Sequence, residues 1–493
     1  MRKPLSLVLM MITVFASAGH ARPNISDDTI HVVFAGDHAD PTIARDGEDF
    51  YLTYTSYEKY PGLKIWHSRN LVDWQPIGYA LHDYVGSVWA PEFIKHEELF
   101  YIYFPTSTGK NYVTTAKDPR GPWSDPVELE VSGIDPGHIV DPDGNRYIYL
   151  NGGKFAHLSD DGLSVTKDAE KKYFGWPYPD DWEVECFCLE SPKLLYRNGY
   201  YYLTSAQGGT AGPPTSHMAV SARASLPEGP WEDSPYNPIV HTWSREERFW
   251  SKGHGTVFDD AEGNWHIIYH AYLQDKLAFG RHVLVEAIEW TGDGWFKTVR
   301  DPKKEANIVF HANERIHSDD FSGSELDIQW QLMGLEPPFD QYRLADGKLH
   351  IEGSEGAMIT LQVNPEERDY EATFEFEIEG KNAEAGVALF YSDENHSGIG
   401  LSDGSFIRVS NGNRRLESSI DTSSIRFMKV RLRDQVASFF YSSDGETWVK
   451  QDRSYEVSGY QHNALGSFSY IRPVFYLKGD GVARVASFRF QPL

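Results

Sequence analysis

Short apolar stretches alternate with turn residues along the first three hundred positions, and one arrangement of them recurs five times. Each repeat starts at a polar residue, passes through a short apolar stretch and a turn, and ends in an aromatic-rich stretch. The aromatic stretches are Phe50-Tyr51-Leu52, Phe100-Tyr101-Ile102, Tyr147-Ile148-Tyr149, Tyr200-Tyr201-Tyr202 and Trp265-His266-Ile267. Turn pairs such as Asp143-Gly144 and Asn198-Gly199 separate the two apolar stretches, as in β-hairpins, where Gly or Asn supplies a positive φ. The pattern predicts paired strands and lacks the 3.6-residue period of helices.

The spacing of these repeats indicates a propeller. The aromatic stretches recur roughly every 50 to 65 residues, which is the length scale of one propeller blade. A second motif supports the repetition, because Gly121-Pro122-Trp123 returns as Gly229-Pro230-Trp231. Five repeats therefore predict a five-bladed β-propeller over residues 30–304.

The pattern changes near residue 305, beyond which the repeat motif is lost. Alternating apolar and polar positions take over at 370–376, 427–432 and 436–441. Short alternating strands at this spacing are typical of a β-sandwich. We therefore expect an all-β protein in which the propeller is followed by a jelly-roll sandwich over residues 318–493.

The first 21 residues have the pattern of a signal peptide. Arg2 and Lys3 precede an apolar run at 5–16, and small residues occupy the cleavage region at 19–21. We expect export to the periplasm or the cell exterior. No later stretch is long and apolar enough to predict a membrane span, so we expect no membrane insertion.

The chain has two cysteines, Cys186 and Cys188, separated by one residue. Such close spacing strains a mutual disulfide, and two thiols are too few for a structural zinc site. We interpret them as packing residues.

Charge restricts the class of ligand. With 72 acidic and 46 basic residues, the formal net charge is −26. An acidic surface repels nucleic acid, anionic membranes and polyuronic substrates. Aromatic residues make up 14% of the chain and suit both a β-rich core and a sugar-binding surface. A neutral ligand fits this composition best.

Alignment of the repeats places one residue from each at equivalent positions, 10 to 12 residues ahead of its aromatic stretch: Asp40, Ala90, Asp135, Glu190 and His254. The innermost strands of a propeller run beside its axis, so these side chains are expected to converge. Carboxylates that share a partly desolvated funnel raise one another's pKa values, which yields the acid and base of glycoside hydrolysis. Singly, each residue could instead cap an ordinary turn. Their recurrence at one repeat position favours an active site.

The motifs at these positions resemble those of glycoside hydrolase family 43. The resemblance covers about residues 31–300, and the region from about 318 is similar to the concanavalin-like sandwich appended to xylosidase-type members. The motifs that carry it are Ala39-Asp40-Pro41, Trp89-Ala90-Pro91-Glu92, Ile134-Asp135-Pro136, Glu190-Ser191-Pro192-Lys193, Gly253-His254-Gly255 and the closing segment 280–290.

The resemblance implies an inverting mechanism. It makes Asp40 the general base, Glu190 the general acid, and Asp135 the third carboxylate, which positions the acid and keeps its pKa high.

Three further residues have a functional and a structural interpretation. Arg281 matches a basic residue near the sugar, and a structural ion pair is the alternative. His254 matches an axial histidine that contacts a calcium ion or water in many members, and a core hydrogen bond is the alternative. Trp89 is either a sugar platform or a blade filler.

The family resemblance, and not a particular residue, suggests the substrate. It implies an exo-acting enzyme that releases terminal α-L-arabinofuranose from arabinoxylan, xyloglucan or arabinan, with terminal β-D-xylose, or both sugars, as the alternative. A non-catalytic carbohydrate-binding protein is the hypothesis of another class. The chemistry requires no cofactor, a structural calcium ion stays open, and the sequence does not indicate an oligomeric state.

Overall fold

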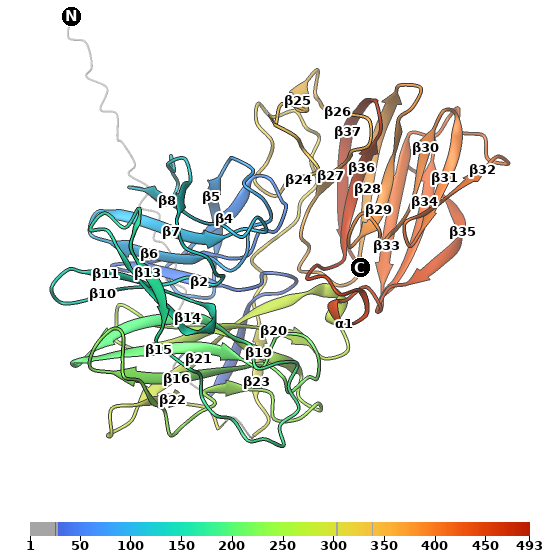
Figure 1. Cartoon of the computed structure of the whole chain (residues 1–493). Coiled ribbons are helices and arrows are strands. Elements are labelled where there is room, and N and C mark those ends of the chain that lie inside the picture. The colour runs from blue at the N-terminus through green and yellow to red at the C-terminus, as the bar shows by residue number, and fades with distance from the viewer. Residues whose placement is uncertain (1–24, 26–27, 302–303, 338) are drawn as a thin grey trace, which may run out of the picture.

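The computed structural model describes residues 25, 28–301, 304–337 and 339–493 (Figure 1). The predicted signal peptide at 1–21 lies outside the described residues. Five small sheets surround a common axis, and two larger sheets pack beside them as a separate β-sandwich (Figure 1). The fold is thus an all-β propeller followed by a sandwich, as the repeat pattern predicts.

The first three blades are regular four-stranded antiparallel sheets, each built in chain order. Their strands are β2 (Thr42–Asp46), β3 (Asp49–Thr53), β4 (Gly62–Ser68) and β5 (Gln75–Leu81); β6 (Glu92–His96), β7 (Leu99–Pro105), β8 (Asn111–Ala116) and β9 (Val127–Leu129); and β10 (Gly137–Val140), β11 (Arg146–Leu150), β12 (Lys154–Leu158) and β13 (Val165–Lys171). A short 3-10 turn, η1 (Asn151–Gly153), joins β11 to β12.

The last two blades are larger. Blade four contains β14 (Leu189–Arg197), β15 (Tyr200–Gln207), β16 (Met218–Ala224), β17 (Glu232–Asp233) and β18 (Val240–His241). Blade five contains β19 (Phe249–Asp259), β20 (Trp265–Leu273), β21 (Arg281–Trp290) and β22 (Phe296–Thr298), together with β1 (Thr29–Phe34) and β23 (Asn307–Phe310). A 3-10 turn, η2 (Leu277–Phe279), precedes β21.

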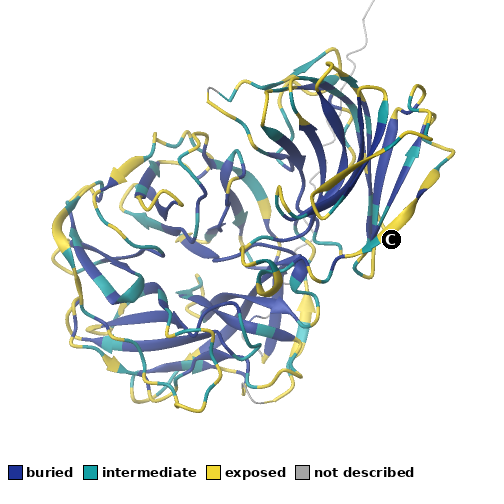
Figure 2. Cartoon of the chain, turned by 45° about the vertical axis from the view of Figure 1, so that its right-hand side comes forward, coloured by how far each residue is buried: buried dark blue, intermediate teal, exposed yellow. Residues whose placement is uncertain are grey.

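The chain closes the propeller by pairing its two ends. Strand β1 pairs with β21, placing Val32 opposite Leu284, and its other edge pairs with β23. The aromatic stretches become the second strand of each blade, where they fill the space between neighbours. Tyr51 of blade one, for example, meets Phe100 of blade two edge-on at 5.3 Å between ring centroids. Figure 2 shows buried strands in both parts and exposed turns around them.

The sandwich consists of two seven-stranded sheets. In sheet order these are β24 (Gln331–Met333), β27 (Met358–Gln362), β36 (Arg472–Lys478), β29 (Glu384–Phe390), β30 (His396–Ser402), β31 (Ser405–Ser410) and β32 (Asn413–Glu417), facing β25 (Tyr342–Ala345), β26 (Lys348–Gly353), β37 (Gly481–Pro492), β28 (Tyr370–Glu379), β33 (Phe427–Arg433), β34 (Val436–Ser442) and β35 (Val449–Glu456). Phe374 packs against Phe475 of the facing sheet at 5.8 Å between ring centroids. Within the described residues, the single α-helix is the short α1 (His462–Leu465).

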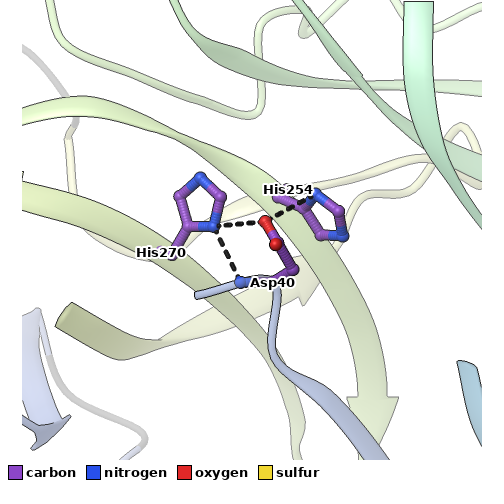
Figure 3. Close-up of side chains that lie close together, drawn as sticks. All are labelled: Asp40, His254 and His270. Atoms are coloured by element: carbon purple, nitrogen blue, oxygen red, sulfur yellow. Dashed lines mark hydrogen bonds and ion pairs between the residues drawn. The ribbon is translucent and has the colours of Figure 1, made fainter. Parts of the chain in front are cut away.

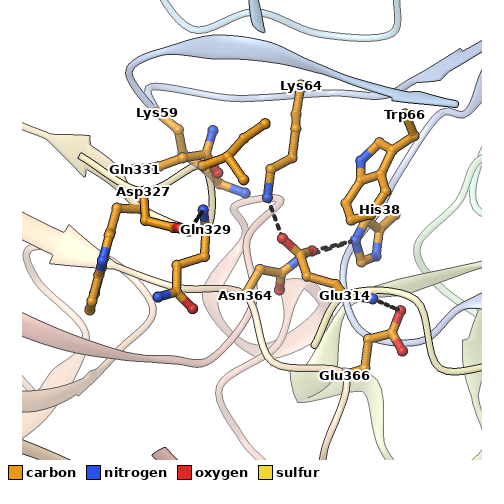
Figure 4. A network of polar contacts seen from close by, with 12 residues as sticks. His38, Lys59, Lys64, Trp66, Glu314, Asp327, Gln329, Gln331, Asn364 and Glu366 are labelled. Atoms are coloured by element: carbon orange, nitrogen blue, oxygen red, sulfur yellow. Dashed lines mark hydrogen bonds and ion pairs between the residues drawn. The ribbon is translucent and has the colours of Figure 1, made fainter. Parts of the chain in front are cut away.

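A buried polar network joins the sandwich to blade one (Figure 4). Glu314, on the connecting segment, forms an ion pair with Lys64 and accepts a hydrogen bond from His38 Nε2 at 3.0 Å. Burial alone would raise the pKa of Glu314, but Lys64 and His38 lower it to about 2. Beside this network, Lys59 Nζ donates to the Tyr470 hydroxyl at 2.7 Å. These contacts fix the sandwich against the propeller.

Candidate active site

An unusual backbone bend recurs in each blade, just before the innermost strand in blades one to three and within it in blades four and five. Asp40, Ala90, Asp135 and Ser191 each precede a proline, and their φ angles are 58°, 28°, 56° and 50°. His254 occupies the fifth such turn with a φ of 56°. Positive φ costs a non-glycine residue about 1–3 kcal/mol and is often found at functional sites. The sequence thus repeats a strained turn at one end of the axis.

The placement of Glu190 in this repeat corrects the alignment made from sequence. Ser191, and not Glu190, occupies the turn position that Asp40 and Asp135 share. Strand β14 has a register irregularity between Glu190 and Lys193, so Glu190 already pairs with Ala206 before the turn. Asp40 and Asp135 are 7% and 4% exposed, whereas Glu190 is only half-buried. The prediction aligned residues by their distance from the aromatic stretch, whereas in the first four blades the positive-φ turn residue is the one that directly precedes proline.

Asp40 is held by groups from blades one and five, and Figure 3 shows two of them, His254 and His270. Oδ1 receives a hydrogen bond from Arg281 Nη1 at 2.9 Å, and Oδ2 receives one from Thr55 Oγ1 at 2.6 Å. His254 Nδ1 and His270 Nδ1 lie 3.4 and 3.2 Å from Oδ1. The Thr55 hydroxyl also accepts the backbone N–H of Ala90 at 2.7 Å, which connects Asp40 to blade two. The carboxylate therefore has a fixed orientation.

The pKa of Asp40 is displaced downward, and the pKa values of Asp135 and Glu190 are displaced upward. Burial would raise the pKa of Asp40, but Arg281, His254 and His270 together hold it well below its ordinary value. The pKa of Glu190 is raised, mostly by burial and then by the charges of Asp135 and Asp40. Burial and then Asp40 raise the pKa of Asp135 as well. An ionised carboxylate thus lies within electrostatic reach of two that favour the protonated form.

Arg281, His254 and Trp89 occupy different surroundings. Arg281 is buried and donates to the Tyr57 hydroxyl at 3.0 Å in addition to Asp40. His254 is buried against Asp40. Trp89 is half-buried, and its indole N–H donates to Ser87 Oγ at 2.9 Å. Arg281 and His254 therefore join the Asp40 cluster, while the Trp89 indole N–H is bonded to Ser87 outside it.

Sequence reasoning left Thr55, Tyr57 and His270 out of this cluster. Thr55 and Tyr57 follow strand β3, and His270 lies within strand β20, so all three lie on or shortly after the second hairpin strand of their blades. A polar residue at the axial end of an aromatic strand was the available signal, and single threonines, tyrosines and histidines are too common there to have been selected.

A second polar layer lies directly after the turns. Lys193 Nζ donates to Glu92 Oε2 at 2.6 Å and to the carbonyls of Pro91 and Pro136 at 3.0 and 3.1 Å. Blades two, three and four are thereby joined through one buried ammonium group. Gly137, the equivalent residue of blade three, leaves the space that this requires, because a Cβ there would lie 1.5 Å from the Pro192 carbonyl oxygen.

The cluster is a poor match for a metal ion held by Asp40, His254 and His270 together. Their ligand atoms lie within 4.8 Å of one another. However, His270 Nδ1 accepts the backbone N–H of Asp40 at 3.0 Å, and Arg281 engages the carboxylate oxygen. Among the three, His254 Nε2 is a buried atom without a hydrogen-bond partner in the described part of the chain. The donor set therefore offers one free ligand, not three.

The sandwich contributes to the rim beside Arg281. Asn463 Oδ1 accepts the Gly212 N–H at 2.9 Å, which ties α1 to a propeller loop. Phe468 stacks on His462 at 3.8 Å between ring centroids, and the Arg281 guanidinium carbon lies 5.2 Å from the Phe468 ring centroid. An aromatic residue of the second domain therefore lies beside the cluster.

The cysteines do not remain separate thiols as predicted. Cys186 and Cys188 form a disulfide with their Cα atoms 5.2 Å apart. This separation lies within the range of ordinary disulfides, because the segment before Glu190 is bent rather than fully extended. The interpretation of the two cysteines as packing residues without a mutual disulfide was wrong.

A five-bladed propeller with three carboxylates around one end of its axis defines a glycosidase-type site. The chain belongs to glycoside hydrolase family 43: the profile described as "Glycosyl hydrolases family 43" matches residues 30–296. The profile described as "Beta xylosidase C-terminal Concanavalin A-like domain" matches residues 318–469. The protein is therefore a glycosidase with an appended concanavalin-like domain. Enzymes of this family need no cofactor for their chemistry.

Relatives with similar organisation carry two kinds of names. The chain is 27% identical to a non-reducing end alpha-L-arabinofuranosidase of Bacteroides ovatus, over 79% of this chain and 78% of that protein. It is 25% identical to a beta-xylosidase of Bacillus subtilis, over 86% and 91%. The structure of a xylan beta-1,4-xylosidase from Bacillus halodurans shares the fold with a TM-score of 0.81, 22% identity and coverage of 93% and 99%.

None of the helices in the described part of the chain has the length and apolar character needed to cross a membrane.

Proposed function

We propose that the protein is an inverting glycosidase in which Asp40 is the general base and Glu190 the general acid. One observation carries the proposal: neighbouring carboxylates have pKa values displaced in opposite directions, that of Asp40 downward and that of Glu190 upward. This division supplies an ionised and a protonated group at one site, as inverting hydrolysis requires.

In the proposed reaction, Glu190 donates its proton to the glycosidic oxygen as the bond to the anomeric carbon breaks. Asp40 accepts a proton from a water molecule whose oxygen attacks the opposite face of that carbon. Arg281 and Thr55 orient the Asp40 carboxylate through their hydrogen bonds. Asp135, when it ionises, raises the pKa of Glu190 further, so Glu190 keeps its proton to higher pH.

We further propose exo action on terminal pentoses of plant cell-wall polysaccharide. The Phe468 side chain beside Arg281 supports a short pocket that closes over a chain end. Terminal α-L-arabinofuranose, from arabinoxylan, xyloglucan or arabinan, is the first candidate. Terminal β-D-xylose is the second, favoured by the beta-xylosidase name of a relative that matches most of the chain.

The remaining roles follow from the same site. Arg281 and Trp89 are proposed to contact the sugar, and His254 Nε2 to bind a water molecule or a calcium ion on the axis. We propose that residues 1–21 direct export to the periplasm or cell exterior, where such polymers occur.

A panel of nitrophenyl pentosides tests this function. The wild-type enzyme should release nitrophenol from the α-L-arabinofuranoside, the β-D-xyloside or both, and NMR should show the product sugar first in the inverted anomeric form. A retained anomer would contradict the base role of Asp40. Binding of oligosaccharides without any hydrolysis would favour a carbohydrate-binding protein instead.

A further inference from the structure

A long connection leads from the outer edge of blade three to Glu190. We call residues 174–188 the strap; it joins β13 to β14. Its outer end follows Lys171, which pairs with Lys154 next to η1. Asn151 of η1 accepts the N–H of Ile134 through its side chain at 2.9 Å, and Ile134 precedes Asp135. Both ends of the strap therefore lie at the carboxylate end of the propeller.

Contacts along the strap hold it against blade four. The Gln207 side chain accepts the Trp176 N–H at 2.7 Å and donates to the Trp176 carbonyl at 2.9 Å. Trp182 stacks on His241 with 4.7 Å between ring centroids. The Glu185 N–H donates to Ser216 Oγ at 2.8 Å, and Gly208 N–H donates to the Cys188 carbonyl at 3.3 Å. The strap is thus an ordered part of the rim.

Two phenylalanines on this ordered segment are left in solvent. Phe174 is 66% exposed and Phe187 is 59% exposed. Phe187 lies between the two cysteines of the disulfide, and its ring centroid is 5.6 Å from that of Tyr178. A Cβ at Gly175 would lie 3.4 Å from Phe187 Cζ, so the residue next to Phe174 lies close to this ring. Exposed aromatic groups gathered on a pinned segment are typical of a binding surface.

The position of the acid indicates what this surface binds. Because Glu190 gives its proton to the oxygen of the leaving group, the leaving sugar must lie on the Glu190 side of the pocket. The strap ends two residues before Glu190. Aromatic faces pack well against the apolar C–H faces of neutral sugars, and ligand sites are generally lined by such side chains.

We propose that Phe187, supported by Tyr178, is a binding platform for the leaving-group sugars of an oligosaccharide, held in place by the Cys186–Cys188 disulfide. The inference rests on the proposed function and deepens it, because it assigns recognition of the polymer to the strap rather than to the pocket. The strap would distinguish substrates by their leaving groups and not by their terminal pentose.

The proposed platform is tested by measuring how the effect of a Phe187 substitution depends on the leaving group of the substrate. The substrates are a pentosyl fluoride, which has no leaving-group sugar, and the trisaccharide that ends in the same pentose. Phe187→Ala should lower kcat/KM on the trisaccharide about fivefold to tenfold, the effect of losing one aromatic contact, and leave kcat/KM on the fluoride unchanged. Leu226→Ala removes a side chain of similar exposure outside the strap and should change neither value.

The disulfide is tested with the same substrates. The Cys186→Ser, Cys188→Ser double variant should show the trisaccharide loss of Phe187→Ala, and so should wild-type enzyme treated with a reductant. Circular dichroism separates a folding defect from this effect, and the Phe187→Ala result stands independently if the double variant does not fold.

The outcomes separate this inference from the function beneath it. If the wild type hydrolyses both substrates and Phe187→Ala loses nothing on the trisaccharide, the platform is wrong and the proposed function stands. Equal losses on fluoride and trisaccharide would also overturn the platform, since they indicate damage to the pocket. If the wild type hydrolyses neither substrate, the proposed function fails and the platform fails with it.

Discussion

Arg281 Nη1 lies 2.9 Å from Asp40 Oδ1, and this contact connects the last blade of the propeller to the first. The pair is buried, so the guanidinium acts on the carboxylate with little screening by solvent. It keeps Asp40 ionised in a position where burial opposes ionisation. The ring closure that joins blade five to blade one therefore also sets the charge of the proposed base.

Substitution of the proposed base and acid should separate their roles. Asp40→Asn and Glu190→Gln should each lower kcat on a nitrophenyl pentoside by about 100-fold or more, which corresponds to about 3 kcal/mol of barrier. With a pentosyl fluoride, which needs no proton donor to leave, Glu190→Gln should recover most of its rate and Asp40→Asn should not. Steady-state kinetics measure both values. Glu232→Gln, an exposed residue of blade four, is the control. Equal behaviour of both variants on the fluoride would contradict the assignment.

The acidic and basic limbs of the pH–activity profile should reflect the titration of two different residues. Activity requires ionised Asp40, whose lowered pKa keeps the acidic limb at low pH, and protonated Glu190, whose raised pKa moves the basic limb upward. Asp135→Asn removes a charge that raises the pKa of Glu190, so the basic limb should shift to lower pH.

Arg281→Met removes the group that lowers the pKa of Asp40 most, so the acidic limb should shift to higher pH. Measurement of kcat/KM across the pH range tests both shifts, because it reports the free enzyme. A purely structural role of Arg281 would lower the rate at every pH without moving the limb.

The ammonium group of Lys193 should be important for stability. It lies in the polar layer after the turns and is 2.6 Å from Glu92 Oε2. Lys193→Met leaves the Glu92 charge buried and unpaired, which should cost about 3–5 kcal/mol of unfolding free energy. Lys110→Met breaks an exposed pair with Glu128 and should cost about 1 kcal/mol or less. Chemical denaturation measures the two changes in unfolding free energy. Similar losses for both variants would show that the buried Lys193–Glu92 pair stabilises the fold no more than the exposed pair does.

The repeat in the sequence predicted the fold because each blade buries an aromatic strand. Stretches such as Phe100-Tyr101-Ile102 are buried between neighbouring sheets, and their number along the chain gives the number of blades. The site was less predictable. The acidic residues near proline are visible in sequence, but Glu190 lies one position further from its proline than Asp40 and Asp135 do, and the irregularity of strand β14 that accompanies this shift is seen only in the structure. His270 reaches Asp40 only through the closure of the propeller, whereas Thr55 reaches it across the first hairpin of blade one.

The junction between the propeller and the sandwich should depend on pH through Glu314. Its folded pKa of about 2 lies below the roughly 4.3 of an unfolded glutamate, so its ion pair stabilises the fold above that value. This contribution is lost as the pH falls from about 4.3 toward 2. Glu314→Gln should therefore lower the Tm at pH 7, and the difference from wild type should shrink across that range. Glu377→Gln breaks a half-exposed pair with Lys348 and should leave the Tm nearly unchanged. Thermal unfolding from pH 2 to pH 7 tests this, and a pH-independent difference would show that the lost hydrogen bonds, and not the charge, matter.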